Sequence, residues 1–178
     1  DALPDCAAVI LTALPMCSIT GVDYGRITRA LAPRLKGAAL DVAPGSLMGD
    51  WLDGYAQTLT ALAKSLPLGP GKIRPGTAAV VGHLMDRNEA DRRADVTELQ
   101  RLLAGAGLEC VSVWLSGRPY TELARIEEAE VIVSLPYARG AARLIAERTG
   151  AMLVEAPLPF GLPKTEGFIR AAATAAGS

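Results

Sequence analysis

The 178-residue sequence is poor in the side chains that most often build catalytic and metal centres. It contains one histidine, so a histidine-based metal site or a Ser–His catalytic pair would have to use His83. Its three cysteines, Cys6, Cys17 and Cys110, are odd in number and widely spaced, which argues against a disulfide framework and favours a reducing compartment. Two Phe and two Trp are too few for an aromatic platform that stacks single-stranded nucleic acid.

Long apolar runs and an excess of one charge are also absent. Half of the residues are hydrophobic and the mean hydropathy is +0.25, but no run approaches the roughly 20 apolar residues that span a bilayer. The net charge of −1 argues against nucleic acid as a partner. Asp1 and Asp5 occupy the place of the basic region of a signal peptide. We therefore expect a cytoplasmic protein without a membrane span.

The second half of the sequence alternates regularly between strand and helix patterns. Short apolar runs joined by helical crossovers indicate a parallel sheet with helices on both faces. We predict that residues 77–178 form a Rossmann-like α/β domain, which binds ligands beyond the carboxyl ends of its strands. The predicted strands are 77–82, 108–115, 131–135 and 151–155, and the predicted helices are 91–104, 119–128, 139–148 and 163–175.

The first half holds only two strand–helix units. Strands are predicted at 7–13 and 38–42, and helices at 24–35 and 50–66. This is little for a free-standing domain, so we interpret residues 1–66 as a partial α/β domain that is the tail of a longer one. Residues 67–76 are rich in Pro and Gly and are predicted to be a linker.

The predicted carboxyl edge of the sheet carries three candidate binding segments. The loop after the first strand lacks the Gly-x-Gly-x-x-Gly pattern, and no Walker loop is present, so neither an NAD nor an ATP site is expected. That loop contains a polar group that either contacts a ligand or caps the next helix: His83, Asp86, Arg87 and Asn88.

Two further loops offer candidate cofactor-binding residues. Tyr137 and Arg139 follow a strand and precede a helix, where anions are favoured; alternatively, Pro136 simply sets a turn there. Phe160 and Gly161 end a stiff apolar loop that begins at residue 156 and either walls a pocket or covers the end of the sheet. Cys17 follows the first strand of the chain, where a thiolate can ligate iron–sulfur, although a small buried residue is the alternative.

The order of these motifs resembles the component 1 superfamily of nitrogenase and nitrogenase-like oxidoreductases. That superfamily includes molybdenum–iron protein subunits, cofactor-assembly scaffolds and the catalytic subunits of light-independent protochlorophyllide reductase. The segments that carry the resemblance are 17–23, 44–55, 80–82, 96–103, 123–129, 136–137, 147–150, 157–161 and 165–169.

The resemblance implies that this chain is the tail of the first and all of the second of three Rossmann-like domains in an oxidoreductase subunit. Cys17 then looks like a cluster-ligating cysteine. The iron–sulfur cluster would be shared with other segments or a homologous second subunit, and an ATP-dependent iron–sulfur reductase would deliver electrons. The Gln and His that true nitrogenases carry on the helix around Trp51 are absent, which argues against dinitrogen reduction.

Two other functions stay open at this point. One is a non-catalytic cofactor-assembly scaffold, and the other is a metal-free domain that binds a small molecule or a partner. Because the family's sites lie between domains and subunits, we expect the isolated chain to be inactive.

Overall fold

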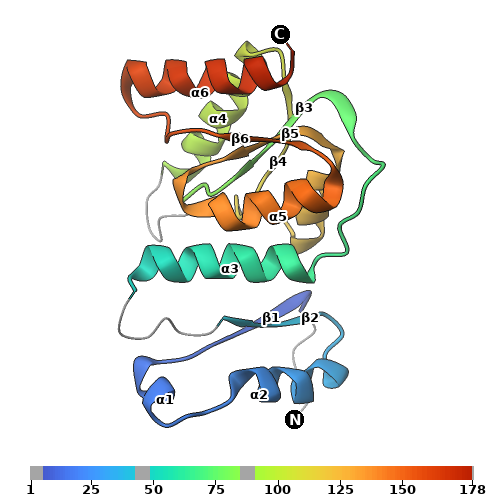
Figure 1. Ribbon diagram of the computed structural model, residues 1–178, viewed down its shortest axis with the longest axis vertical. Helices are drawn as coiled ribbons and strands as arrows, with labels where there is room; N and C mark the ends of the chain where they lie inside the picture. The colour runs from blue at the N-terminus through green and yellow to red at the C-terminus, as the bar shows by residue number, and fades with distance from the viewer. Residues whose placement is uncertain (1–5, 43–48, 85–90, 178) are drawn as a thin grey trace. The chain divides into compact units, whose positions relative to one another are not determined.

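The computed structural model describes residues 6–42, 49–84 and 91–177. The chain divides into two compact units, Asp1–Leu66 and Pro67–Ser178. Each unit contains a parallel sheet with helical crossovers (Figure 1). None of the helices in the described part of the chain is long and apolar enough to cross a membrane.

The N-terminal unit is built on one pair of parallel strands. β1 (Ala8–Thr12) pairs with β2 (Ala38–Val42) in a register that runs from Ala8↔Ala38 to Thr12↔Val42. The crossover between them consists of α1 (Pro15–Ile19), α2 (Tyr24–Leu31) and η1 (Ala32–Arg34), and α3 (Trp51–Ser65) comes last. The predicted strand–helix alternation of this half is therefore present, with α1 as an additional short helix.

Side-chain caps fix where the two longer helices of this unit begin. The Asp50 carboxylate accepts hydrogen bonds from the backbone N–H groups of Leu52 and Asp53, at 2.8 and 3.1 Å, and Asp53 Oδ2 accepts one from Asp50 N–H at 2.9 Å. This reciprocal capping box satisfies N–H groups that a helix start leaves open. Asp23 caps α2 by accepting a hydrogen bond from Arg26 N–H.

The C-terminal unit is a four-stranded sheet in which every pairing is parallel and the strand order is β4-β3-β5-β6. The four predicted strands are all present, and the fold is Rossmann-like α/β. Helices α4 and α6 cover one face and α5 and η2 the other (Figure 1). The elements are β3 (Arg74–Val81), α4 (Arg92–Gly105), β4 (Glu109–Val113), η2 (Tyr120–Glu128), β5 (Ala129–Ser134), η3 (Pro136–Ala138), α5 (Arg139–Thr149), β6 (Met152–Glu155) and α6 (Gly161–Ala175).

The centre of this unit is strand β3. Its residues 78–81 are fully buried, because β4 and β5 flank the strand and helices cover both faces. The face under α4 and α6 forms one apolar cluster in which Phe168 of α6 is fully buried. Other members of that cluster are Ala78, Val80, Leu99, Leu103, Val131, Val133 and Ala172.

One predicted helix is of a different type. Residues 119–128 were expected to form an α-helix, but Tyr120–Glu128 is a 3-10 helix. The buried indole of Trp114 donates a hydrogen bond from Nε1 to Leu123 O at 3.2 Å, so it uses a carbonyl that an α-helix would pair with the N–H of Glu127. The chain therefore turns more tightly here, as 3-10 segments do in connections.

The residues that precede β3 are fastened to this unit by a buried carboxylate. Glu127 is 4% exposed and accepts hydrogen bonds from Gly69 N–H at 2.7 Å and from Lys72 Nζ at 2.6 Å. Burial by itself would raise the pKa of Glu127, but the hydrogen bonds from Lys72 and Gly69 and the charges of Lys72 and Arg148 outweigh it, so the pKa lies below its usual value.

We predict that Glu127→Gln lowers the free energy of unfolding by about 2 kcal/mol at pH 7, because charge-assisted hydrogen bonds to a buried carboxylate are lost. A carboxylate whose pKa is lower in the folded state stabilises the fold at pH values above its unfolded pKa. This stabilisation is lost as the pH falls through the folded pKa. The difference from wild type should therefore shrink below about pH 4.3. Urea unfolding at pH 7 and pH 3.5 measures it. Glu166→Gln, which removes an exposed ion pair, is the control. An equal loss in both variants would contradict this role.

We also predict that Gly82→Ala lowers the free energy of unfolding by about 3 kcal/mol. Gly82 has φ 97°, and a Cβ there would lie 2.7 Å from Cβ of Ala138 and 3.2 Å from that of Leu135. Gly105→Ala is the matched control, because open space surrounds that helical position; it should be neutral or slightly stabilising. Guanidinium unfolding compares them. Equal midpoints would show that the chain at Gly82 shifts freely.

Candidate functional site

The carboxyl ends of the four strands meet at one edge of the C-terminal sheet, where doubly wound proteins bind ligands. Residues 82–84 follow β3, 114–119 follow β4, 135–138 follow β5 and 156–160 follow β6. Backbone hydrogen bonds extend the pairing past the strand ends: Trp114 N–H donates to Val80 O at 3.0 Å and Leu135 N–H donates to Val81 O at 2.9 Å.

A small hollow of about 130 Å³ lies at this edge. It is walled by the end of β3, the first turns of α4 and the loop after β6. The residues that define it are His83, Asp95, Leu99, Leu135, Leu158 and Phe160. Its lining is mostly apolar with a few convergent polar groups, which is the composition of a small-molecule site, although its volume is below the usual range of about 300–1,000 Å³.

His83 lines this hollow together with two carboxylates, those of Asp95 and Glu98. It is 6% exposed, and burial lowers its pKa, while the carboxylate of Asp95 raises it and the guanidinium of Arg92 lowers it. The net direction is downward, so the imidazole is neutral at pH 7. The structure thus brings His83 to the predicted edge. The other polar residues of that loop, Asp86, Arg87 and Asn88, lie outside the described residues.

Arg139 is engaged by the strand ends. Its guanidinium donates from Nη1 to Ser134 O and from Nη2 to Ala156 O, the latter at 3.3 Å, and Nε lies 3.2 Å from Glu155 Oε2. The side chain therefore joins the ends of β5 and β6. Tyr137, also predicted as a binding residue, is half-buried in η3. Among the described residues, neither of these two lines the hollow, whereas Phe160 does.

Phe160 and Gly161 lie where the loop after β6 becomes α6. Gly161 has φ 70°, and Phe160 N–H donates to Leu158 O at 2.8 Å. Although Phe160 lines the hollow, it is 72% exposed, and Leu162 is 87% exposed. Large apolar side chains this exposed and this close together are typical of a surface that meets a partner.

Cys17 lies on α1, in the N-terminal unit. Its thiol lies beside the Tyr24 hydroxyl and raises the pKa of Tyr24. The segment around Cys17 is apolar and open: Leu14, Met16 and Ile19 are each at least 66% exposed. Cys17 itself is half-buried. Full burial of its thiol would need contact with another protein surface.

Within the described ranges, no group of three or more His, Cys, Asp or Glu side chains could hold a metal ion. If the Cys17 thiolate ligates an iron–sulfur cluster, as predicted, the described residues do not supply the other ligands. A cluster needs about four protein ligands, so its other ligands would have to come from outside these residues.

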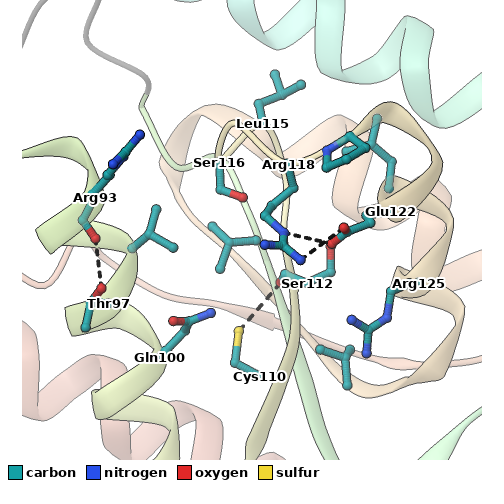
Figure 2. A pocket seen from close by; sticks show the side chains of 15 residues that line it. Arg93, Thr97, Gln100, Cys110, Ser112, Leu115, Ser116, Arg118, Glu122 and Arg125 are labelled. Carbon is teal, nitrogen blue, oxygen red and sulfur yellow. Dashed lines mark hydrogen bonds and ion pairs between the residues drawn. The ribbon is translucent and has the colours of Figure 1, made fainter. Parts of the chain in front are cut away.

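A second, larger cavity was not anticipated from the sequence. It is a groove of about 410 Å³ along strand β4, at the edge of the same sheet (Figure 2). Its residues are spread over α4, β4 and η2, and no local motif joins them. A pair of oppositely charged residues four apart, Arg118 and Glu122, was the one signal in the sequence.

These features define an α/β protein with a Rossmann-like unit and a second, smaller parallel α/β unit. The sequence matches the family of nitrogenase component 1 type oxidoreductases over residues 2–178. The chain belongs to this family.

Solved structures agree with this fold. A structure described as nitrogenase Cp1 at pH 6.5 superposes with a TM-score of 0.73 at 18% identity, over 98% of this chain and 42% of that one. A second, nitrogenase Cp1 at pH 5, gives a TM-score of 0.65 at 12% identity, over 96% and 37%. This chain thus spans about two fifths of those chains. No curated protein matches.

We predict that Arg139→Ala lowers the free energy of unfolding by about 1–2 kcal/mol, because two backbone carbonyls each lose one hydrogen bond. Arg139→Lys should recover less than half of this, since an ammonium group cannot form the same fork. Arg143→Ala is the control, because Arg143 approaches Glu155 only to 3.9 Å. Thermal and urea unfolding measure both. If Arg139→Ala costs no more than Arg143→Ala, the guanidinium is available for a ligand.

Proposed function

We propose that this chain is part of a nitrogenase-like component 1 oxidoreductase subunit that accepts electrons from an ATP-dependent iron–sulfur reductase. The family match over residues 2–178 is the observation that carries this proposal. Cys17 is the proposed cluster ligand. An iron–sulfur cluster, when bound, supplies one-electron transfer.

The surroundings of Cys17 support this assignment. Cys17 lies on α1, which begins at Pro15 shortly after β1 ends at Thr12, so the parallel β1–β2 pair positions the start of its segment. The exposed side chains of Leu14, Met16 and Ile19 form an apolar border on both sides of it in the sequence. Another subunit or another part of the protein that covers these side chains would exclude water from the thiolate and bring the remaining ligands. A homologous second subunit is the partner we propose.

The edge of the C-terminal sheet is the proposed place for substrate or partner contact. His83 offers a neutral imidazole at the hollow, and Phe160 and Gly161 form an exposed border beside it. Arg139 joins the ends of β5 and β6 next to the turn after β5, on which Tyr137 lies. In this arrangement Arg139 holds the ends of β5 and β6 together, and Phe160 contacts the substrate or partner.

The decisive experiment measures iron and acid-labile sulfide, with visible absorption, in the full-length protein that carries this chain. It is purified anaerobically with its partner subunit, as wild type, Cys17→Ala and Cys110→Ala. We expect bound iron and sulfide in wild type, a loss of at least about half in Cys17→Ala because one of about four thiolate ligands is missing, and no change in Cys110→Ala.

The outcomes separate the candidate functions. Iron–sulfur that is reduced only with the reductase and ATP supports the oxidoreductase. Iron–sulfur that the reductase leaves oxidised indicates a cofactor-assembly scaffold. Protein that stays metal-free after cluster reconstitution contradicts the proposal and leaves a binding domain on the same fold. Full iron content in Cys17→Ala removes Cys17 as a ligand.

A further inference from the structure

The groove along β4 is a cavity that the proposed function does not use. Strand β4 is at the end of the sheet order, so only one of its sides is paired with another strand. Helix α4 walls the open side on one face and η2 on the other, and Cys110 and Ser112 lie on the floor (Figure 2). The cavity volume of about 410 Å³ is within the range of roughly 300–1,000 Å³ that small-molecule sites occupy.

The walls of this groove are positively charged. Three guanidinium groups line it, those of Arg93, Arg118 and Arg125, and Glu122 supplies the single lining carboxylate. Arg125 is also paired with a carboxylate outside the lining, because its Nε lies 3.3 Å from Glu128 Oε1. The C-terminal unit as a whole contains equal numbers of basic and acidic side chains. The excess of positive charge is therefore local to the groove and follows from how the chain folds.

The guanidinium groups retain capacity for a ligand. Arg118 donates two hydrogen bonds to the Glu122 carboxylate, from Nε at 2.9 Å and from Nη2 at 3.0 Å. Its Nη1 takes no part in this pair. The guanidinium of Arg93 makes no hydrogen bond or ion pair with any described residue; only its backbone carbonyl is used, by Thr97. Figure 2 shows Arg118 over the strand, with Arg93 and Gln100 on the opposite wall.

The loop that ends the groove is held in a strained conformation. Leu115 has φ 58°, and it is the one non-glycine residue with positive φ in the described part of the chain. Gly117, at φ 87°, has no side chain, and a Cβ there would come within 3.0 Å of Arg92 Nη2. A leucine in the left-handed region persists only where its surroundings demand it, and such residues cluster at ligand sites. This loop places Ser116 and Arg118 at the mouth of the groove.

We propose that this groove binds a small organic anion with at least two carboxylate or phosphate groups. One anionic group meets the guanidinium of Arg118 and the other that of Arg93, because a guanidinium fork matches both oxyanions. The hydroxyl of Ser116 and the amide of Gln100 supply further hydrogen bonds, and Val96 packs against the carbon skeleton. This inference does not depend on the redox function.

Isothermal titration calorimetry of the 178-residue chain tests the proposal, with citrate as the carboxylate probe and inorganic pyrophosphate as the phosphate probe. We expect saturable binding of at least one probe in 20 mM NaCl, with a Kd below about 1 mM and weaker binding in 500 mM NaCl because salt screens the charges. Which probe binds more tightly identifies the anionic group.

Charge-removing variants locate the site. Arg118→Gln and Arg93→Gln should each weaken binding about tenfold, since each loses a charge-assisted contact. Arg170→Gln is the matched control: Arg170 also pairs with a glutamate four residues away, Glu166, on the surface of α6 outside the groove. It should leave the Kd within about twofold, because exposed ion pairs contribute little. Unchanged thermal midpoints will show that all three variants fold.

Three results would overturn the proposal. The first is no saturable heat with either probe up to 10 mM, roughly tenfold above the expected Kd. The second is an equal loss in Arg170→Gln, which would mean that the whole surface attracts anions. The third is binding of an octaglutamate peptide with no binding of the small anions, which would assign the open edge of β4 to an extended acidic segment of another protein.

Discussion

The C-terminal unit depends on one buried strand. Residues 78–81 of β3 are shielded on both faces and on both edges, so their backbone groups must pair with β4 and β5, since unpaired buried amides are costly. The strand then has to end within a narrow space, beside Leu135 and Ala138, and glycine at position 82 is what allows it. That ending places His83 at the carboxyl edge. The hollow beside β3 is thus a consequence of how the central strand is packed.

Most of the architecture could be predicted because strands and helices of this fold have local signatures. Short apolar runs bounded by Gly or Pro mark the four strands. The helix predicted at 139–148 ends at Thr149, where Gly150 forms a left-handed cap at φ 81°. The 3-10 form of Tyr120–Glu128 could not be predicted, because the Trp114 indole that takes up the Leu123 carbonyl lies outside the segment and reaches it only through the packing of the fold. Pro75, which lacks an N–H, lies where the β3–β5 register shifts, so β3 begins inside the segment predicted as a linker.

Site residues were harder to predict than the fold, because a loop position does not reveal what a side chain touches. Arg139 has the sequence context of an anion-binding residue, but its guanidinium meets two backbone carbonyls and Glu155. His83 could be located at the sheet edge, although its near-complete burial follows from packing against α4 and the loop after β6. The groove at β4 escaped prediction because its walls come from segments that are joined only through the fold.

Exposure of large apolar side chains argues that neither unit presents its finished surface in this chain alone. In the N-terminal unit Leu14, Met16 and Ile19 surround Cys17, and in the C-terminal unit Phe160 and Leu162 project beside the hollow. Exposing these five side chains to water costs roughly 25 cal/mol of free energy for each Å² of apolar area. Neither segment contributes these side chains to the internal core of its unit. Both segments also adjoin the residues with the most distinctive chemistry, a cysteine and a buried imidazole. The proposed second subunit would cover these side chains, and the same contact would bring the ligands that the proposed cluster at Cys17 needs.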